Sequence, residues 1–197
     1  MPAFETDAVV FKCRAPLPAA DALAQAAVFA AQAQSVALAQ ANVNVSLDGA
    51  EAYAYLLLGE PVALAAAPLA AAFAGAAGVP AVEAVRLARL QDLRGAAHGV
   101  AVRFHYVVET DVAPEAEGEF NDWYDTEHLP GLAAVPGTIR TQRFRSLDGG
   151  PRYHACYELV APQTLGSAPW LAVRHTAWSA RVRPNFRNTK RTMFRRV

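Results

Sequence analysis

The sequence feature that most constrains the fold is an order of strands and helices that occurs twice. In the first half, alternating and apolar runs predict strands at 8–13, 40–47, 53–58 and 82–87, with helices at 22–36 and 62–74. In the second half, they predict strands at 100–108, 138–145, 153–160 and 189–196, with helices at 114–129 and 168–182. Asp48-Gly49 and Asp148-Gly149 are hairpin signals at the same place in each half. The sequence therefore predicts two βαββαβ units in tandem.

A βαββαβ unit is a ferredoxin-like sheet with both helices on one face, and its other face also needs cover. Two copies provide that cover by packing sheet to sheet. We therefore predict an α+β fold of two ferredoxin-like units, an alanine-rich one at residues 1–98 and a second at 99–197. On the strand at 100–108, Phe104 and Tyr106 lie on the face suited to the helices.

Composition excludes several classes of protein. The 18 Lys and Arg balance 18 Asp and Glu, whereas a general nucleic-acid binder carries a basic excess. Cys13 and Cys156 are far apart, which excludes a C-x-x-C motif and favours small buried hydrophobes. Residues 1–7 are acidic where a signal peptide is basic, and no strongly apolar span of about 20 residues occurs. We expect a soluble, cytoplasmic protein without membrane or nucleic-acid partners.

The stretch 119–140 holds the densest set of chemically useful side chains. On a helix, Tyr124 and His128 share a face, and Trp123 and Glu127 form the neighbouring pair. Pro130 is expected to end that helix and to leave His128 in its last turn. The helix dipole and nearby acids would then raise the histidine pKa modestly, which suits a proton shuttle near neutral pH.

Trp-Tyr-x-x-x-His-x-Pro at 123–130, followed by Pro136-Gly137 and an Arg-containing strand, resembles the dimeric α+β barrel superfamily, and most closely its EthD-like and stress-responsive members. The motif covers about 119–145, while the first half matches in layout only. The resemblance implies a ligand pocket between sheet and helices, with His128 in it. Superfamily members include cofactor-free oxygenases, isomerases and cyclases, some haem enzymes and many proteins without an assigned activity.

Each candidate residue also has a structural interpretation. His128 is an acid/base or a helix-capping histidine, and Trp123 and Tyr124 line a pocket or belong to the core. Arg140 and Arg143 are candidates for binding a carboxylate or enolate oxygen, and only one of them can face a given pocket, because they are three apart on a strand. His105 and His154 fall on strands and are more simply satisfied interface histidines.

Charge is segregated in the second half. Residues 109–127 are acidic without Lys or Arg, and no acid follows Glu158, although many arginines do. Contact between these complementary segments explains the pattern, and the alternative is a basic edge for an anionic ligand or nucleic acid. No metal-ligand spacing, nucleotide motif or serine-hydrolase motif occurs, so no metal and no bound cofactor are predicted, while haem stays open because one histidine suffices.

These patterns lead to one leading hypothesis and two alternatives. The leading hypothesis is a small-molecule pocket enzyme without a cofactor, of oxygenase, isomerase or cyclase type, acting on an apolar carbonyl compound. Its catalytic candidates are His128, Tyr124 and Arg140, and its substrate-binding candidates are Trp123, Arg143, Phe104 and Tyr106. The alternatives are a non-catalytic ligand-binding or stress-associated barrel and a haem-binding barrel. A homodimer is left open.

Overall fold

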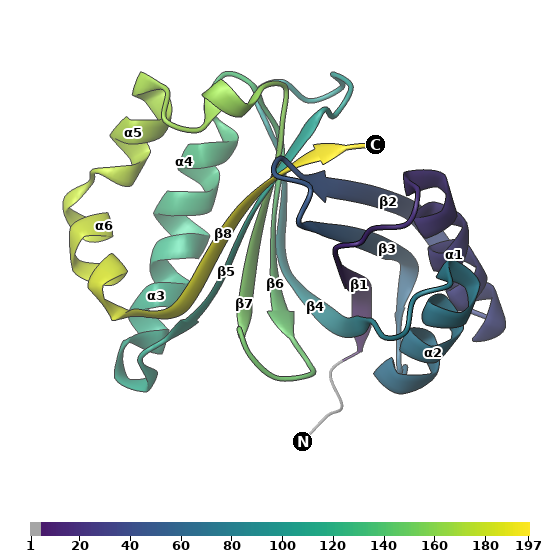
Figure 1. Cartoon of the computed structure of the whole chain (residues 1–197). Helices are drawn as coiled ribbons and strands as arrows, with labels where there is room; N and C mark the ends of the chain where they lie inside the picture. The colour runs from purple at the N-terminus through teal and green to yellow at the C-terminus, as the bar shows by residue number, and fades with distance from the viewer. Residues whose placement is uncertain (1–4) are drawn as a thin grey trace. The chain divides into compact units, whose positions relative to one another are not determined.

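The computed structural model describes residues 5–197 and confirms the predicted α+β fold and its order of elements (Figure 1). The first half contains β1 (Thr6–Arg14), α1 (Ala20–Ala33), β2 (Leu38–Ser46), β3 (Glu51–Val62), α2 (Ala66–Ala77) and β4 (Glu83–Arg94). The second half contains β5 (Phe104–Val112), α3 (Glu117–Trp123), a π-helical turn (Tyr124–His128), α4 (Leu129–Ala133), β6 (Thr138–Ser146), β7 (Tyr153–Leu159), α5 (Ala168–Arg174), α6 (Ala177–Val182) and β8 (Phe186–Arg196).

The chain divides into two compact units. The first runs to Arg89 and adds Arg145–Gly149 and Phe194–Val197, while the second holds Leu90–Phe144 and Gly150–Met193. Neighbouring strands follow the order β4-β1-β3-β2 in the first and β8-β5-β7-β6 in the second, as a ferredoxin-like unit requires. The complete order, β1-β3-β2-β8-β5-β7-β6-β4, is that of a closed barrel.

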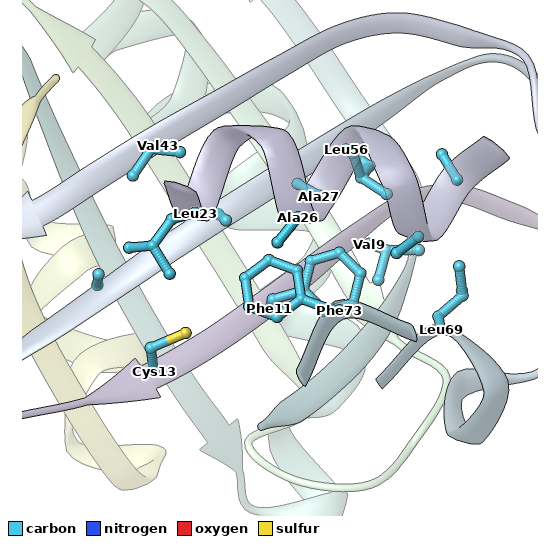
Figure 2. Close-up of a cluster of buried hydrophobic side chains, with 14 of the residues drawn as sticks. Val9, Phe11, Cys13, Leu23, Ala26, Ala27, Val43, Leu56, Leu69 and Phe73 are labelled. Carbon is cyan, nitrogen blue, oxygen red and sulfur yellow. The ribbon is translucent and has the colours of Figure 1, made fainter. Parts of the chain in front are cut away.

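The first unit has an interior of alanine, leucine and phenylalanine. Four alanines on one face of α1 are fully buried or nearly so, namely Ala26, Ala27, Ala30 and Ala31. Their small side chains let the helix lie close to its sheet, and the rings of Phe11 and Phe73 stack at 4.3 Å to fill the remaining space (Figure 2). Cys13 belongs to this cluster, and burial raises its pKa to about 11.

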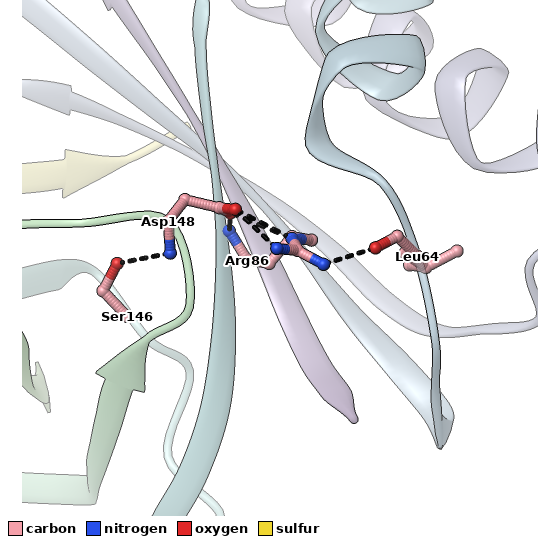
Figure 3. Close-up of polar contacts among 4 residues, drawn as sticks. All are labelled: Leu64, Arg86, Ser146 and Asp148. Atoms are coloured by element: carbon pink, nitrogen blue, oxygen red, sulfur yellow. Dashed lines mark hydrogen bonds and ion pairs between the residues drawn. The ribbon is translucent and has the colours of Figure 1, made fainter. Parts of the chain in front are cut away.

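An arginine–carboxylate pair within the first unit holds the segment Arg145–Gly149, which begins the turn between β6 and β7. Arg86 Nε and Nη2 donate to Asp148 Oδ1 at 3.0 and 2.7 Å, and Asp148 Oδ2 accepts from the Arg86 backbone N–H at 2.7 Å. Arg86 Nη1 also donates to the Leu64 carbonyl oxygen, and Asp148 N–H donates to Ser146 Oγ (Figure 3). The carboxylate raises the pKa of Arg86, so the guanidinium stays charged.

The second unit has an aromatic interior. Figure 1 shows α3 to α6 on one side of its strands, and the buried cluster between them contains Phe120, Trp123, Tyr124, Tyr157 and Trp170. Close packing of two helices depends on one glycine, because a Cβ at Gly131 of α4 would lie 2.8 Å from Val173 Cγ1 of α5.

Three predicted boundaries are wrong. Gly59-Glu60-Pro61 does not end the third strand, because β3 continues to Val62. The helix predicted at 168–182 is two helices, since Thr176 caps α6 by accepting from Ser179 N–H. The helix at 114–129 does not stop at Pro130, which lies in the first turn of α4, where a missing N–H costs nothing.

Other sequence expectations have mixed outcomes. Cys13 and Cys156 are both buried and free, as predicted. None of the helices in residues 5–197 has the length and apolar character needed to span a bilayer. Of residues 1–7, from which the absence of a signal peptide was predicted, residues 1–4 lie outside the described residues.

Candidate functional site

A small cavity in the second unit brings several of the predicted residues together. Its volume is about 30 Å³, enough for one or two water molecules. The lining side chains from the sheet, the π-helical turn and α5 are mainly aromatic and include Tyr106, Trp123, Tyr124, His128, Tyr157 and Trp170. Half-buried Leu165 and Phe186 also line it. The cavity is therefore lined by aromatic rings, several of which carry a polar atom, and it is large enough for water.

The π-helical turn Tyr124–His128 sets the geometry of the histidine. In a π turn, residues five apart come onto one face, and the rings of Trp123 and His128 stack at 4.0 Å with an angle of 20° between their planes. Tyr124 meets the same imidazole edge-on at 5.3 Å. The sequence predicted that Tyr124 and His128 share a face, but not the insertion that places Trp123 against the imidazole.

A carboxylate holds the tryptophan in this position. Trp123 Nε1 donates to Glu127 Oε1 at 3.2 Å, and Thr176 Oγ1 donates to the same oxygen at 2.6 Å. Thr176 is also the N-cap of α6. Glu127 therefore links the π-helical turn to α6 and orients Trp123, while Trp123 in turn orients His128.

His128 is neutral in this environment. Burial lowers its pKa to about 3, and the positive charges of Arg174 and Arg183 act in the same direction. The sequence-based expectation of a raised pKa is wrong, because the acids next in sequence do not face the ring and the helix continues beyond it. Nδ1 of His128 and Nε1 of Trp170 are buried without a hydrogen-bond partner among the described residues. The cavity thus offers two unsatisfied polar atoms.

Two tyrosine hydroxyls in the cavity form a hydrogen-bonded pair. Tyr124 and Tyr157 share a side-chain hydrogen bond, and desolvation raises the pKa of both phenols. Burial raises the pKa of Tyr106 as well. All three phenols are therefore protonated at neutral pH. The hydrogen bond between Tyr124 and Tyr157 uses one of their two protons, so Tyr106 and one phenol of the pair can donate to a carbonyl oxygen.

Three arginines at the cavity were not identified as site residues from the sequence. Arg174 ends α5, Arg183 follows α6 and Arg191 lies on β8, and all three line the cavity. Arg174 and Arg183 are half-buried and Arg191 is exposed, whereas the aromatic lining is buried, so the arginines lie at the open end. The excess of arginine after Glu158 was the signal, and it was interpreted as a complement to the acidic segment. That interpretation holds for Arg181, which pairs with Glu119 at 3.4 Å.

Arg143 lies beside the cavity wall and not in its lining. Its side chain is 1% exposed and pairs with Asp125 at 3.1 Å, while Nη2 donates to Asn121 Oδ1. The guanidinium lies over the Tyr124 ring at 4.5 Å and over the Phe120 and Tyr153 rings at 4.9 Å each. Arg143 therefore holds Tyr124 in position from behind.

The structure does not bring Arg140 and His128 together. Arg140 pairs with Asp92, and its Nε–Oδ1 distance is 2.8 Å. Both line a separate cleft of about 590 Å³, together with Arg94, His98 and Glu158. Because β6 alternates its side chains, a residue three positions from Arg143 faces away from the aromatic cluster. The cleft therefore carries paired charges of both signs.

The remaining candidates fall outside the His128 cavity. Phe104 is half-buried and packs against the aromatic cluster without lining the cavity. His105 and His154 are buried on β5 and β7, and His154 Nδ1 lies 3.8 Å from Glu109 Oε1. They have the surroundings expected of structural histidines.

The residues as placed do not form a metal or haem site. Within residues 5–197, no group of three or more His, Cys, Asp or Glu side chains is arranged to hold a metal ion. Cofactor-sized ligands occupy about 300 Å³ or more, and the His128 cavity has about 30 Å³. With Trp123 stacked on the imidazole, a haem would reach His128 only after these side chains move, as would any ligand larger than water.

Comparison with known proteins shows that this chain is similar in fold to several solved structures. No family model matches the sequence, and no curated protein is similar to it. A putative monooxygenase from Lactobacillus acidophilus superimposes with a TM-score of 0.61 at 10% identity, over 98% of this chain and 94% of the other. One from Fusobacterium nucleatum gives 0.62 at 10% identity, over 100% and 94%. An anthrone oxidase-like protein gives 0.56 at 14% identity, over 100% and 94%.

These similarities decide the fold. The chain has the dimeric α+β barrel fold. The fold that the resemblance implied is thereby confirmed. At 14% identity or less, residue roles cannot be transferred, so the chemistry of the site depends on this chain's own side chains.

Proposed function

We propose that the second unit is a small-molecule enzyme without a bound cofactor, which removes a proton next to the carbonyl group of an apolar compound. The observation that carries this proposal is the buried His128 imidazole, which is uncharged and has an unpartnered Nδ1 at a cavity lined by aromatic rings. The imidazole is unprotonated at neutral pH, so a ring nitrogen can accept a proton. With a pKa of about 3 it is a weak base, so the negative charge of the enolate that forms beside it must stabilise the imidazolium. An isolated orphan nitrogen is costly unless a ligand or water uses it.

The side chains around His128 supply the other parts of such a step. As the proton passes to His128, the C–H electron pair forms a C=C bond and the carbonyl π pair moves onto oxygen, and the resulting enolate needs hydrogen-bond donors. Tyr124 and Tyr157 present protonated hydroxyls, and Arg174 and Arg183 add positive charge. Return of the proton to another carbon gives an isomerase, attack of the enolate carbon on an electrophilic carbon of the same molecule gives a cyclase, and reaction of the enolate with molecular oxygen as the oxidant gives an oxygenase.

The cavity must widen to admit such a compound. Its volume of about 30 Å³ accommodates water. Leu165 and Phe186 are half-buried lining side chains and can turn aside at lower cost than the buried tryptophans. The solved structures with this fold include monooxygenase-named and anthrone oxidase-like proteins. Those names support a planar carbonyl compound as the first substrate to test.

The test is hydrogen exchange of anthrone. Its methylene hydrogens exchange with D₂O through the enolate, and NMR follows the loss of their signal. We expect the wild-type protein to accelerate exchange and His128→Asn to lose about 100-fold or more of that acceleration. His175→Asn is the matched control, because His175 is exposed and outside the cavity lining.

Two alternatives give different results in the same experiment. For a non-catalytic ligand-binding or stress-associated barrel, wild-type protein would bind anthrone without accelerating exchange, and His128→Asn would change only the melting temperature. For a haem-binding barrel, added haemin would give a Soret band that His128→Ala removes. If the wild-type protein did not accelerate exchange, the proposed enzymatic function would be rejected.

Several finer expectations belong to the same proposal. We propose that the two halves, 1–98 and 99–197, arose as tandem copies and that the relationship is to EthD-like proteins. A cytoplasmic homodimer that binds a small molecule and no nucleic acid follows from the same hypothesis. Native mass spectrometry of purified protein tests the oligomeric state and any retained ligand together.

A further inference from the structure

The geometry points to an oxyanion site formed by Arg174, Arg183 and Arg191 at the open end of the His128 cavity, for the carboxylate or phosphate group of an aromatic compound. This inference deepens the proposed function, because it names the charge class of the ligand that the same cavity takes. It depends on three observations about the arginines and their surroundings.

The first observation is that the three guanidiniums are close together and lack acidic partners. Arg174 and Arg191 lower the pKa of Arg183 by charge repulsion, second only to desolvation, and no carboxylate offsets this effect. None of the three arginines has an ion pair or a side-chain hydrogen bond within the described residues, unlike Arg181, Arg143 and Arg140. Like charges held together without a counter-charge destabilise a fold, and a bound anion removes that cost.

The second observation is that the cluster adjoins a built cavity and not open surface. All three arginines line the same cavity as His128 and Trp170, whose Nδ1 and Nε1 atoms are buried and unpartnered. Both side chains are more than nine-tenths buried. The site thus has charged donors among its more exposed lining residues and unsatisfied polar atoms on two of its buried ones, so a ligand with one anionic end and one polar, ring-bearing end matches it.

The third observation concerns the shape that the walls accept. Tyr106, Tyr157 and Trp170 meet at edge-on or tilted angles, and together with Trp123 they line a narrow space. Flat rings pack well against such walls, and guanidiniums bind carboxylate and phosphate oxygens in paired hydrogen bonds. The arginines lie on three separate elements, so an oxyanion between them would be held from several sides.

The experiment compares three ligands of one shape, namely 2-naphthoate, 2-naphthyl phosphate and neutral 2-naphthamide. Binding is followed by calorimetry at low and high salt. We expect at least one of the anions to bind about 10-fold or more tightly than the amide, with the advantage shrinking as salt screens the arginines. Preference between the two anions distinguishes a carboxylate from a phosphate ligand.

Arginine variants test whether these side chains are responsible. Arg183→Gln and Arg191→Gln should each reduce anion affinity about 10-fold and leave amide affinity unchanged. Arg181→Gln is the matched control, because Arg181 is exposed, pairs with Glu119 and lies outside the cavity lining. Arg183→Lys, which retains the charge, should recover part of the loss and provides a second variant if the glutamine variant does not fold.

Two results would overturn the oxyanion site. One is equal affinity for the amide and both anions, and the other is an equal loss in Arg181→Gln and Arg183→Gln. The outcome is separate from that of the proposed enzyme, because anthrone is uncharged. Exchange of anthrone without anion preference would support the enzyme alone, and arginine-dependent naphthoate binding without exchange would support the oxyanion site alone.

Discussion

The two units have the same order of strands and helices and very different interiors. In the first, the buried cluster is apolar throughout and consists largely of alanine and leucine packed around Phe11 and Phe73. In the second, the cluster is aromatic, and Arg143 and His128 are buried beside it. Both kinds of buried cluster are compatible with a ferredoxin-like unit. The second has a cavity whose lining residues carry unsatisfied nitrogens and protonated phenols, which are groups that acid–base chemistry can use.

The difference follows from the sizes of the helix side chains. The buried alanines of α1 pack against the apolar cluster of the first unit and bring no side-chain polar atom into it. In the second unit the helices instead bury large rings, those of Trp123, Tyr124 and Trp170, and each ring carries a polar atom that requires a partner. A packed apolar layer thus favours stability, whereas an imperfectly filled aromatic layer permits a binding site.

The largest effect is expected from opening the apolar interior. Phe73→Ala removes a fully buried ring stacked on Phe11, and we expect it to lower the free energy of unfolding by about 3–5 kcal/mol in urea titrations. Phe29→Ala on α1 is the control, because Phe29 is 52% exposed and should cost about 0.5 kcal/mol or less. Similar losses in both variants would contradict the assigned core.

A buried charge should matter nearly as much in the second unit. Arg143→Ala leaves Asn121 Oδ1 without its donor and three rings without their cation, and we expect a loss of about 2–3 kcal/mol with a changed near-UV spectrum. Arg143→Met fills the space without a charge and should recover about half of that loss. If Arg143→Ala left the free energy of unfolding unchanged, the guanidinium would have no role in holding Tyr124.

Acid should destabilise the protein through His128. Its pKa is about 3 when folded and near 6.5 when unfolded, so between these values the unfolded chain binds a proton that the folded chain does not. The free energy of unfolding therefore falls as pH falls, by about 2 kcal/mol between pH 8 and pH 5 from this group. His128→Leu should remove that part of the slope in urea titrations, and exposed His175→Leu should not. Identical slopes in wild type and His128→Leu would show that the imidazole titrates normally.

The smallest effect is expected at the Arg86–Asp148 pair of the first unit. Both side chains retain some exposure, 24% and 20%, so solvent and salt weaken their attraction. We expect Arg86→Gln to cost about 1 kcal/mol at low salt and less at high salt, measured by thermal unfolding. A loss as large as that of Arg143→Ala would remove the contrast between a partly solvated and a buried arginine.

The candidate site was predicted in part. His128, Tyr124, Trp123 and Tyr106 line one cavity. Helical spacing had placed Tyr124 and His128 on one face, strand alternation had placed Tyr106 toward the helices, and the resemblance had implied a pocket between sheet and helices. Arg140 is paired with Asp92 at a separate cleft, and the partner of a side chain across 48 residues is not visible in local periodicity. The arginines that do reach the cavity come from α5, the turn after α6 and β8, and are brought together only by folding.

The sequence by itself determined the strands, the hairpins and the repeated βαββαβ order, because alternation, turn residues and caps act over a few neighbouring positions. Tertiary structure decided the charge of His128 and the identity of its neighbours. A π-helical turn moved the ring against Trp123, burial removed its water, and distant arginines supplied the nearby charge. Desolvation and long-range charge depend on what the whole unit encloses, and no local pattern encodes that.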